Sequence, residues 1–181
     1  MSHVPHHESD SVFTQFVADE AHYEAVLKRA AAARRMLWLG TADIKGLYVE
    51  GERPFLGTLA QLLKRGVEVR LIHAKEPGQI FRDEFDRYPV LAQRLERVLC
   101  PRVHFKLVIA DARWAYIGSA NLTGAGMGMK SPLRRNFEAG VLTSDPALVA
   151  AAMEEFDRVW RGSGCARCGR RRFCPDPIGA V

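Results

Sequence analysis

The chain has 181 residues, of which 48% are hydrophobic, and its formal net charge is +5. This length suits one domain with a proper core. No apolar run approaches the roughly 20 residues of a membrane-spanning helix, and the first ten residues lack the apolar stretch of a secretory signal, so we expect a cytoplasmic protein. The moderately basic charge fits a nucleic acid or an anionic lipid as partner but decides little by itself.

In chain order, the first half of the sequence predicts an α/β fold. A polar segment, residues 1–15, is expected to be a flexible leader. An amphipathic helix follows over about residues 18–35, and the short apolar run 36–40 predicts a buried strand. A second helix is predicted over residues 55–66, and a second strand over 67–73. Strand, helix and strand at this spacing indicate a mixed or parallel central sheet.

The next part of the chain contains a helical region and an incomplete motif. Apolar residues recur at helical spacing over residues 78–99, and Pro89 is expected to interrupt this helix because proline lacks a backbone donor. Just before it stands His73-Ala74-Lys75, a His-x-Lys pair. Unlike the His-x-Lys pair at residues 104–106, this pair has no Asp five positions after its Lys and no Gly-Ser-x-Asn after that. We therefore interpret it as the end of a strand.

The segment 103–111 predicts the strand around which the functional site is organised. Its apolar residues alternate with other residue types, so one face is expected to be buried. His104 and Lys106 share the opposite face, roughly 6 to 7 Å apart, within reach of one anionic group such as a phosphate. A hairpin turn and a returning strand then end in Gly118-Ser119-Ala120-Asn121. Ser119 and Asn121 are therefore expected beside the His-x-Lys pair.

His-x-Lys, four residues, Asp, six residues and Gly-Ser-x-Asn together resemble the signature of the phospholipase D superfamily. The resemblance implies that His104 is a nucleophile that attacks phosphorus and forms a phosphohistidine. Lys106 and Asn121 would hold the non-bridging oxygens, and Asp111 and Ser119 would be supporting residues. This chemistry requires no catalytic cofactor or metal ion.

The same resemblance implies a fold and an assembly. It implies an α/β domain over residues 16–162, in which a central mixed β-sheet is flanked by helices on both faces. A second imidazole must protonate the leaving oxygen and later activate water. Because the chain contains one full motif, we expect a symmetric homodimer in which His104 of the partner subunit supplies that imidazole. Glu138, in the segment 135–141, matches the acidic residue that orients the nucleophile.

Between the motif and the last helix lies a glycine-rich segment, residues 122–132. It has three alternate glycines and no apolar period, and we expect a mobile loop at the mouth of the site. Lys130, Arg134 and Arg135 are candidates for contacts with the backbone phosphates of a polymeric substrate. The final helix is predicted to begin at Ser144-Asp145-Pro146, where a capping residue precedes an early proline.

The composition changes abruptly in a basic, Cys-rich tail, residues 163–181. Cys165 and Cys168 form a Cys-x-x-Cys-Gly knuckle typical of zinc sites, Cys174 is a third candidate ligand, and Cys100 is a candidate fourth. If Cys100 takes part, the tail folds back to the entrance of the motif strand. We prefer structural zinc, and the alternatives are an iron–sulfur cluster and free or disulfide-bonded thiols.

Clustered arginines favour a nuclease over a lipid enzyme. Residues 158–172 include six arginines and no acidic residue, a composition that suits contacts with a nucleic-acid backbone. The sequence contains no base-reading module, so such binding is expected to be independent of sequence. We therefore predict a phospholipase D-like phosphodiesterase, a homodimeric nuclease. The first alternative is a phospholipase D or phosphatidyl transferase acting on lipids, and the second is a non-catalytic nucleic-acid-binding module.

Overall fold

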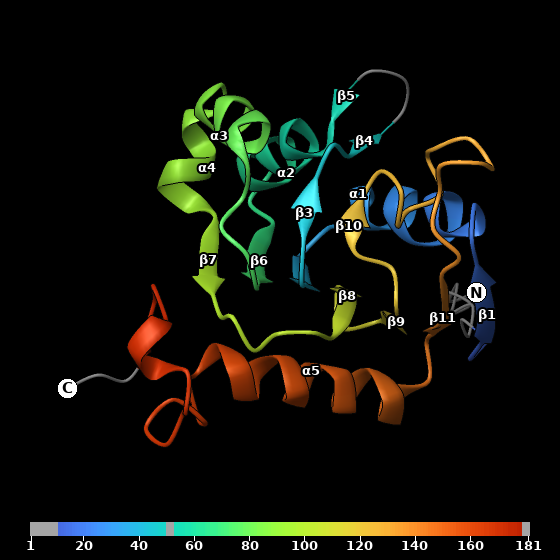
Figure 1. Ribbon diagram of the computed structural model, residues 1–181. Coiled ribbons are helices and arrows are strands. Elements are labelled where there is room, and N and C mark those ends of the chain that lie inside the picture. Colours follow the sequence, from blue (N-terminus) through green and yellow to red (C-terminus); the bar gives the residue numbers. More distant parts are fainter. Residues whose placement is uncertain (1–10, 50–52, 179–181) are drawn as a thin grey trace, which may run out of the picture.

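The computed structural model describes residues 11–49 and 53–178. Its main feature is a seven-stranded sheet with the order β1-β11-β9-β8-β2-β6-β7 (Figure 1). The strands of this sheet are β1 (Thr14–Ala18), β2 (Met36–Thr41), β6 (Glu68–His73), β7 (Glu96–Leu99), β8 (Lys106–Ala110), β9 (Trp114–Gly118) and β11 (Ala139–Thr143). Two small two-stranded sheets pair β3 (Ile44–Lys45) with β10 (Leu122–Thr123) and β4 (Tyr48–Val49) with β5 (Arg53–Pro54).

The strand directions confirm the predicted mixed sheet. β2, β6 and β7 run parallel to one another. β8 runs antiparallel to β2, and β9, β11 and β1 continue the antiparallel half. The parallel half follows from the alternation of strands with helices, and the antiparallel half contains the hairpin between β8 and β9.

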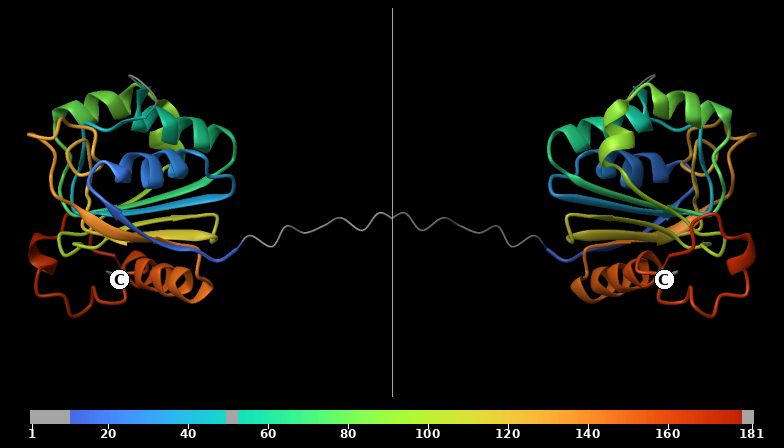
Figure 2. Two further views of the ribbon diagram at one scale, coloured as in Figure 1. Left: turned by 90° about the vertical axis from the view of Figure 1, so that its right-hand side faces the viewer. Right: turned by 90° about the vertical axis from the view of Figure 1, so that its left-hand side faces the viewer.

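Helices cover both faces of the sheet, as predicted. The helical segments are η1 (Tyr23–Lys28), α1 (Arg29–Ala31), α2 (Phe55–Lys64), α3 (Gln79–Asp86), α4 (Pro89–Arg94), α5 (Pro146–Trp160) and η2 (Arg171–Phe173). Figure 2 shows α5 on one face and η1 to α4 on the other. Each face has its own apolar core, and α5 packs on β8 and β9. Within the described residues, no helix is long and apolar enough to cross a membrane.

Three boundaries differ from the expectations. β1 begins at Thr14, inside the segment 1–15 expected as a leader, of which residues 1–10 lie outside the described part of the chain. The helix expected over 18–35 is confined to η1 and α1, between Tyr23 and Ala31. The helical region expected over 78–99 ends at Arg94, because β7 pairs in parallel with β6 and buries Val98. Tertiary pairing outweighs the helical spacing there.

The motif strand shows the expected alternation, but the regular strand is shorter than expected. Residues 101–105 have no regular structure and β8 begins at Lys106. Val103, Phe105 and the odd-numbered positions after them pack in the core on the α5 side. Gly40 on β2 makes room for this packing, since a Cβ atom there would lie 2.3 Å from Cε2 of Phe105. The other face of β8 is buried too, because helices cover the sheet on both sides.

Candidate active site

One edge of the central sheet collects the motif residues. The parallel strands β2 and β6 end there at Thr41 and His73, which pair with each other. β8 begins and β9 ends at the same edge, where Lys106 pairs with Gly118. Leu107 pairs with Gly40 and packs on the α5 side. Because successive side chains of a strand alternate between faces, the Lys106 and Thr41 side chains lie on the side opposite α5.

His104 and Lys106 lie side by side at this edge. The Lys106 Nζ atom is 3.3 Å from Nδ1 and 3.5 Å from Nε2 of His104, and it donates a 2.7 Å hydrogen bond to the His104 carbonyl oxygen. His104 is exposed, whereas Lys106 is buried. Burial lowers the pKa of Lys106, and the charge of Glu138 acts in the opposite direction. An exposed imidazole next to a buried ammonium suits an anion that approaches from solvent.

Asn121 is held in one orientation by the end of β2. Its Oδ1 atom accepts hydrogen bonds from Thr41 Oγ1 at 3.2 Å, from the Ala42 amide at 3.1 Å and from the Asp43 amide at 3.2 Å. Because all three donors meet Oδ1, the amide nitrogen Nδ2 is turned away from them. Nδ2 is therefore a donor that the fold orients in advance.

Glu138 contacts Ser119 rather than His104. Its Oε2 atom accepts a hydrogen bond from the Ser119 hydroxyl, and Oε1 accepts a 2.9 Å bond from Nδ2 of Asn136. The Ser119 hydroxyl oxygen in turn accepts the Ala139 amide at 3.0 Å, which connects β9 to β11. Glu138 is buried, at 9% exposure, so these partners satisfy a carboxylate that would otherwise be costly to bury.

Asp111 lies at the far end of β8. It lies five positions after Lys106, which corresponds to about 16 Å along a strand. Its carboxylate accepts three backbone amides at the start of β2, from Arg34 at 3.1 Å, Arg35 at 2.7 Å and Met36 at 3.1 Å. Burial acts to raise the pKa of Asp111, but these hydrogen bonds outweigh it and hold the pKa below its usual value. Asp111 thus supports the fold and does not reach the His104 edge.

The comparisons with known proteins agree with this geometry. The family model described as "Cardiolipin synthase, PLD-like domain" matches residues 26–160. The chain belongs to the phospholipase D-like family. The comparison with curated proteins gave no match.

Solved structures share the fold of this PLD-like domain. NucT from Helicobacter pylori is similar with a TM-score of 0.62 and 14% identity, over 82% of this chain and 95% of that one. Nuc from Salmonella typhimurium, a phospholipase D family member, has a TM-score of 0.62 and 18% identity, over 83% and 95%. TrmBL2, an archaeal chromatin protein, has a TM-score of 0.57 and 17% identity, over 81% and 51%. At these identities the likeness shows the fold alone.

The PLD-like domain has a buried hydrogen-bond network that the sequence reasoning missed. His22 is fully buried; its Nδ1 atom donates to the Asp19 carbonyl oxygen at 2.9 Å, and in the neutral ring Nε2 accepts from the Tyr116 hydroxyl at 2.8 Å. The Tyr116 oxygen accepts the Ala120 amide at 3.3 Å, and burial raises the Tyr116 pKa to about 12. Asp19 Oδ1 accepts the Glu138 amide at 3.0 Å. The network therefore joins the N-terminal segment to the strand ends that hold the site.

Two neighbouring glycines make room for the Tyr116 ring. A Cβ atom at Gly118 would lie 2.2 Å from the Tyr116 hydroxyl oxygen, and one at Gly140 would lie 2.4 Å from its Cε2 atom. The glycine of Gly-Ser-x-Asn is thus required by the packing of the Tyr116 ring. Gly118 and Gly140 were the signal in the sequence from which this network could have been found. The signal can be recognised only when the pairing of β9 with β11 is known, because that pairing brings both glycines to the Tyr116 ring.

The glycine-rich segment is packed, in contrast to the mobile loop that we expected. Residues 122–127 are largely buried. A Cβ atom at Gly126 would lie 2.5 Å from the Asn121 carbonyl oxygen, and one at Gly128, whose φ is +71°, would lie 2.4 Å from Cα of Glu20. The glycines therefore permit a close approach of backbone segments. The lack of an apolar period in this part of the sequence does not indicate mobility.

The three predicted phosphate-binding cations differ in their surroundings. Lys130 and Arg134 are exposed. Arg135 is partly buried and pairs with Glu20 across 2.8 Å. Lys130 and Arg134 remain candidates for substrate contact, whereas Arg135 connects the residues after the glycine-rich segment to Glu20.

The second His-x-Lys pair forms a strand end, as predicted. His73 is the last residue of β6, is fully buried and donates from Nδ1 to the Lys75 carbonyl oxygen at 2.7 Å. Burial lowers its pKa. Lys75 is exposed, so the pair does not form a second His–Lys site like that of His104 and Lys106.

The tail returns to the entrance of the motif strand, as its cysteines suggested. The Leu99 amide donates to Asp176 Oδ2 at 3.3 Å, and the Arg170 guanidinium donates to the Pro101 carbonyl oxygen at 2.9 Å. All four cysteines are free thiols that line one cavity together. Nowhere in residues 11–49 and 53–178 are three or more His, Cys, Asp or Glu side chains already placed to hold a metal ion. The expected zinc site is therefore not formed in this arrangement of the thiols.

Proposed function

We propose that the protein is a sequence-nonspecific nuclease of the phospholipase D-like family that acts through His104. The single observation that carries the proposal is the pairing of an exposed imidazole with a buried ammonium, 3.3 Å from Nζ to Nδ1, at the edge where the Asn121 amide is held in advance. These three groups provide a nucleophile, a cation and a neutral donor for one phosphodiester.

The proposed reaction has two displacement steps. In the first, a ring nitrogen of His104 attacks phosphorus and forms a P–N bond. The P–O bond to the leaving alcohol breaks, and an imidazolium of the second subunit gives the leaving oxygen a proton. In the second, water attacks phosphorus, gives its proton to the same imidazole, and the P–N bond breaks. Lys106 and Asn121 stabilise the negative charge on the non-bridging oxygens in both steps. Proton transfer by a placed imidazole contributes about 10²- to 10⁴-fold.

The proposal includes a symmetric homodimer, because one chain has one full motif. His104 of the partner subunit would be the acid and base. An exposed aromatic side chain beside the site supports such an assembly. Phe137, next to Glu138, is 95% exposed. Aromatic and apolar side chains of this kind are enriched at protein interfaces.

Nucleic acid is the substrate class that the charges favour. Lys130 and Arg134 are exposed cations in the part of the chain between Asn121 and Glu138, and the tail adds further arginines. A repeating phosphate backbone fits such a spread of positive charge better than a single headgroup does. One similar structure fits the same substrate class, since TrmBL2 is described as a chromatin protein with a mode of DNA binding. Lipid phosphodiesters are the competing substrate.

The decisive experiment compares wild type, His104→Asn and Lys75→Ala on four substrates in EDTA. The substrates are single-stranded DNA, duplex DNA, RNA and a fluorescent phospholipid. Lys75→Ala is the matched control, because it alters the incomplete His-x-Lys pair at an exposed position. We expect cutting of nucleic acid by wild type and by Lys75→Ala, and loss of at least about 10³-fold in His104→Asn.

The other outcomes separate the alternatives. Turnover of lipid alone identifies a lipid phosphodiesterase. Binding of nucleic acid without turnover of any substrate identifies a non-catalytic binding module. A phosphate bound to His104, found by mass spectrometry after an acid-free quench of wild type, supports the covalent step. Equal activity of His104→Asn and wild type contradicts the proposal as a whole.

A further inference from the structure

The segment after α5, residues 161–178, is ordered without a core of its own. None of its side chains is buried, and its only regular element is the three-residue η2. Phe173, its one aromatic residue, is 73% exposed. The family match ends at residue 160, so the segment is an addition to the PLD-like domain. Burial of apolar surface ordinarily offsets the loss of chain entropy, and this segment has almost none, so another interaction must stabilise it.

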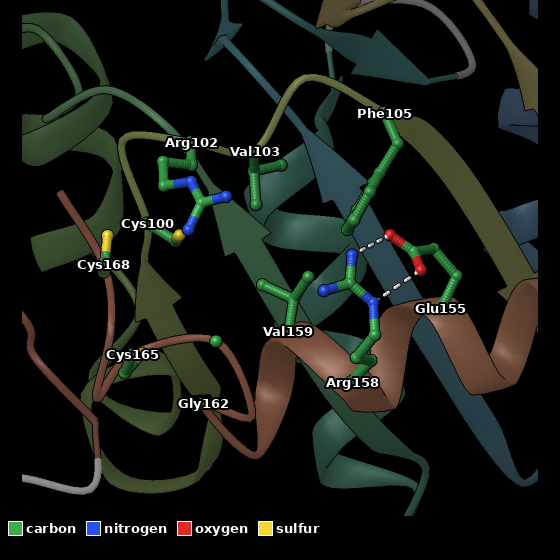
Figure 3. A pocket seen from close by; sticks show the side chains of 11 residues that line it. Cys100, Arg102, Val103, Phe105, Glu155, Arg158, Val159, Gly162, Cys165 and Cys168 are labelled. Carbon is green, nitrogen blue, oxygen red and sulfur yellow. Dashed lines mark hydrogen bonds and ion pairs between the residues drawn. The ribbon is translucent and has the colours of Figure 1, made fainter. Parts of the chain in front are cut away.

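All four cysteines of the chain surround one small cavity at this place. Cys100 comes from the segment that follows β7, and Cys165, Cys168 and Cys174 come from the tail. The cavity has a volume of about 20 Å³. That volume suits one ion or one water molecule and is too small for a four-iron cluster. Figure 3 shows Cys100, Cys165 and Cys168 at the adjoining pocket, which extends along α5.

The backbone around the first two cysteines has the turn that a metal knuckle requires. The Cys168 amide donates to the Cys165 carbonyl oxygen at 3.1 Å, which closes the Cys-x-x-Cys turn. The Arg171 amide then donates to the Cys168 carbonyl oxygen at 3.1 Å, so the chain turns again directly after the second cysteine. The two turns place Cys165 and Cys168 at the same cavity.

Positive charge around the cavity is the second, independent observation. Arg102, Arg170 and Arg171 line the same cavity as the cysteines. No acidic residue lies among residues 158–172, and the one carboxylate of the tail, Asp176, accepts the Leu99 amide. Three guanidinium groups around neutral thiols would repel one another. A complex of one +2 ion with four thiolates has a net charge of −2. Such a complex would attract the three arginines and explains why they gather there.

We propose that Cys100, Cys165, Cys168 and Cys174 bind one structural Zn²⁺ ion. Zinc takes four thiolates in tetrahedral geometry, and structural sites of this kind supply folding free energy to segments that lack a core. The thiols must turn toward the cavity that they line, since they do not yet form a ligand set. The ion would fasten the tail to the residues that lead into β8. Cys100 lies four positions before His104, so the site would also fix the approach to the nucleophile.

The first test measures metal in the full chain, purified without chelator and without a metal-affinity tag. We expect about one zinc per chain by elemental analysis and a visible spectrum of tetrahedral thiolate coordination after replacement by Co²⁺. Cys168→Ser should lose most of the zinc, whereas Ala166→Ser, which adds a hydroxyl group at an exposed position of the same turn, should retain it. His104→Asn should retain it as well, so failure of the catalytic proposal is separable from failure of this one.

A second measurement keeps the test decisive if Cys168→Ser is poorly folded. In wild type, a thiol reagent should react with four cysteines only after zinc is removed by a strong chelator, and zinc release should follow thiol modification in proportion. Metal-free wild type with four reactive thiols and a stable tail overturns the proposal. Disulfide bonds found by mass spectrometry under non-reducing conditions, or iron with acid-labile sulfide, overturn it too.

Discussion

The most informative substitution is Asp111→Asn, because it separates a fold role from a chemical role within the motif. The Asp111 carboxylate accepts three backbone amides from the start of β2. A hydrogen bond to a charged group contributes about 1.5 to 3 kcal/mol, but the bonds to Arg34 and Arg35 are exposed, so water can replace them. We therefore expect Asp111→Asn to lower the free energy of unfolding by about 2 kcal/mol, or about 4 to 8 °C in Tm.

Asp111→Ala tests the backbone contribution separately. Asp111 has a φ of +57°, in the left-handed region that Asp and Asn tolerate better than Ala. The alanine variant should therefore lose about 1 kcal/mol more than the asparagine variant. Asp86→Asn, an exposed carboxylate on α3, is the matched control and should leave Tm unchanged.

The pH dependence has a definite sign. Since the folded pKa of Asp111 lies below the value of 3.8 expected without the fold, the carboxylate stabilises the protein fully above that pH. The contribution is lost as the pH falls through the lowered pKa. The difference in stability between wild type and Asp111→Asn should accordingly be constant at neutral pH and shrink below about pH 4.

The assay combines thermal unfolding with turnover per folded molecule. Because Asp111 lies about 16 Å along the strand from Lys106, kcat of the folded variant should stay within about twofold of wild type, that is within about 0.4 kcal/mol. A Tm equal to that of wild type together with a tenfold or greater loss of kcat would show that this carboxylate acts in the reaction, and the reasoning from its hydrogen bonds would be wrong.

Three further predictions concern the site and its assembly. Asn121→Asp keeps the acceptor for the three donors at and after the end of β2 but replaces the Nδ2 donor by a carboxylate oxygen, so kcat should fall about 10²- to 10³-fold with Tm preserved. Wild-type kcat would refute the assigned role. Mixing wild type with excess His104→Asn should reduce activity more than dilution does, because heterodimers contain one imidazole; strictly proportional activity would indicate a self-sufficient monomer. Tyr116→Phe leaves buried Nε2 of His22 without its partner and should cost about 1 to 3 kcal/mol by denaturant unfolding, and an unchanged midpoint would exclude an important network.

The central strands and their order of appearance could be predicted from local patterns. The apolar runs at β2 and, after Lys106, at β8 are strong signals because these strands are covered on both faces. β7 was missed, since its four residues follow a helical pattern and their pairing partner β6 lies more than twenty residues earlier. β1 was missed for the same reason, because its partner β11 is at the other end of the chain.

The contacts of the site likewise fall into those that short spacings in the sequence predict and those that depend on distant segments. His104, Lys106, Ser119 and Asn121 belong to one hairpin, so short spacings in the sequence were enough to bring them together. The contact between the Asp19 carboxylate and the Glu138 amide spans 119 positions, and no spacing rule connects them. The contact of Glu138 with the Ser119 hydroxyl also required the register of β9 and β11.

The contact between Glu138 and Ser119 leads to a last prediction, on the charge of Lys106. Burial lowers the pKa of the Lys106 ammonium, and the negative charge of Glu138 partly restores it. Glu138→Gln removes that charge and keeps the shape of the side chain, so the Lys106 pKa should fall further. Because the proposed reaction needs the ammonium form, activity should be lost at a lower pH on the alkaline side of the pH profile than in wild type.

Ser119→Ala is the matched control for this shift. It removes the hydroxyl group that Glu138 accepts from and leaves the carboxylate charge in place. Its alkaline limb should therefore stay near that of wild type, even if kcat falls because the carboxylate is held less firmly. A displaced limb in Ser119→Ala with an unmoved limb in Glu138→Gln would mean that hydrogen bonding, and not the charge beside Lys106, sets the ionisation that activity requires.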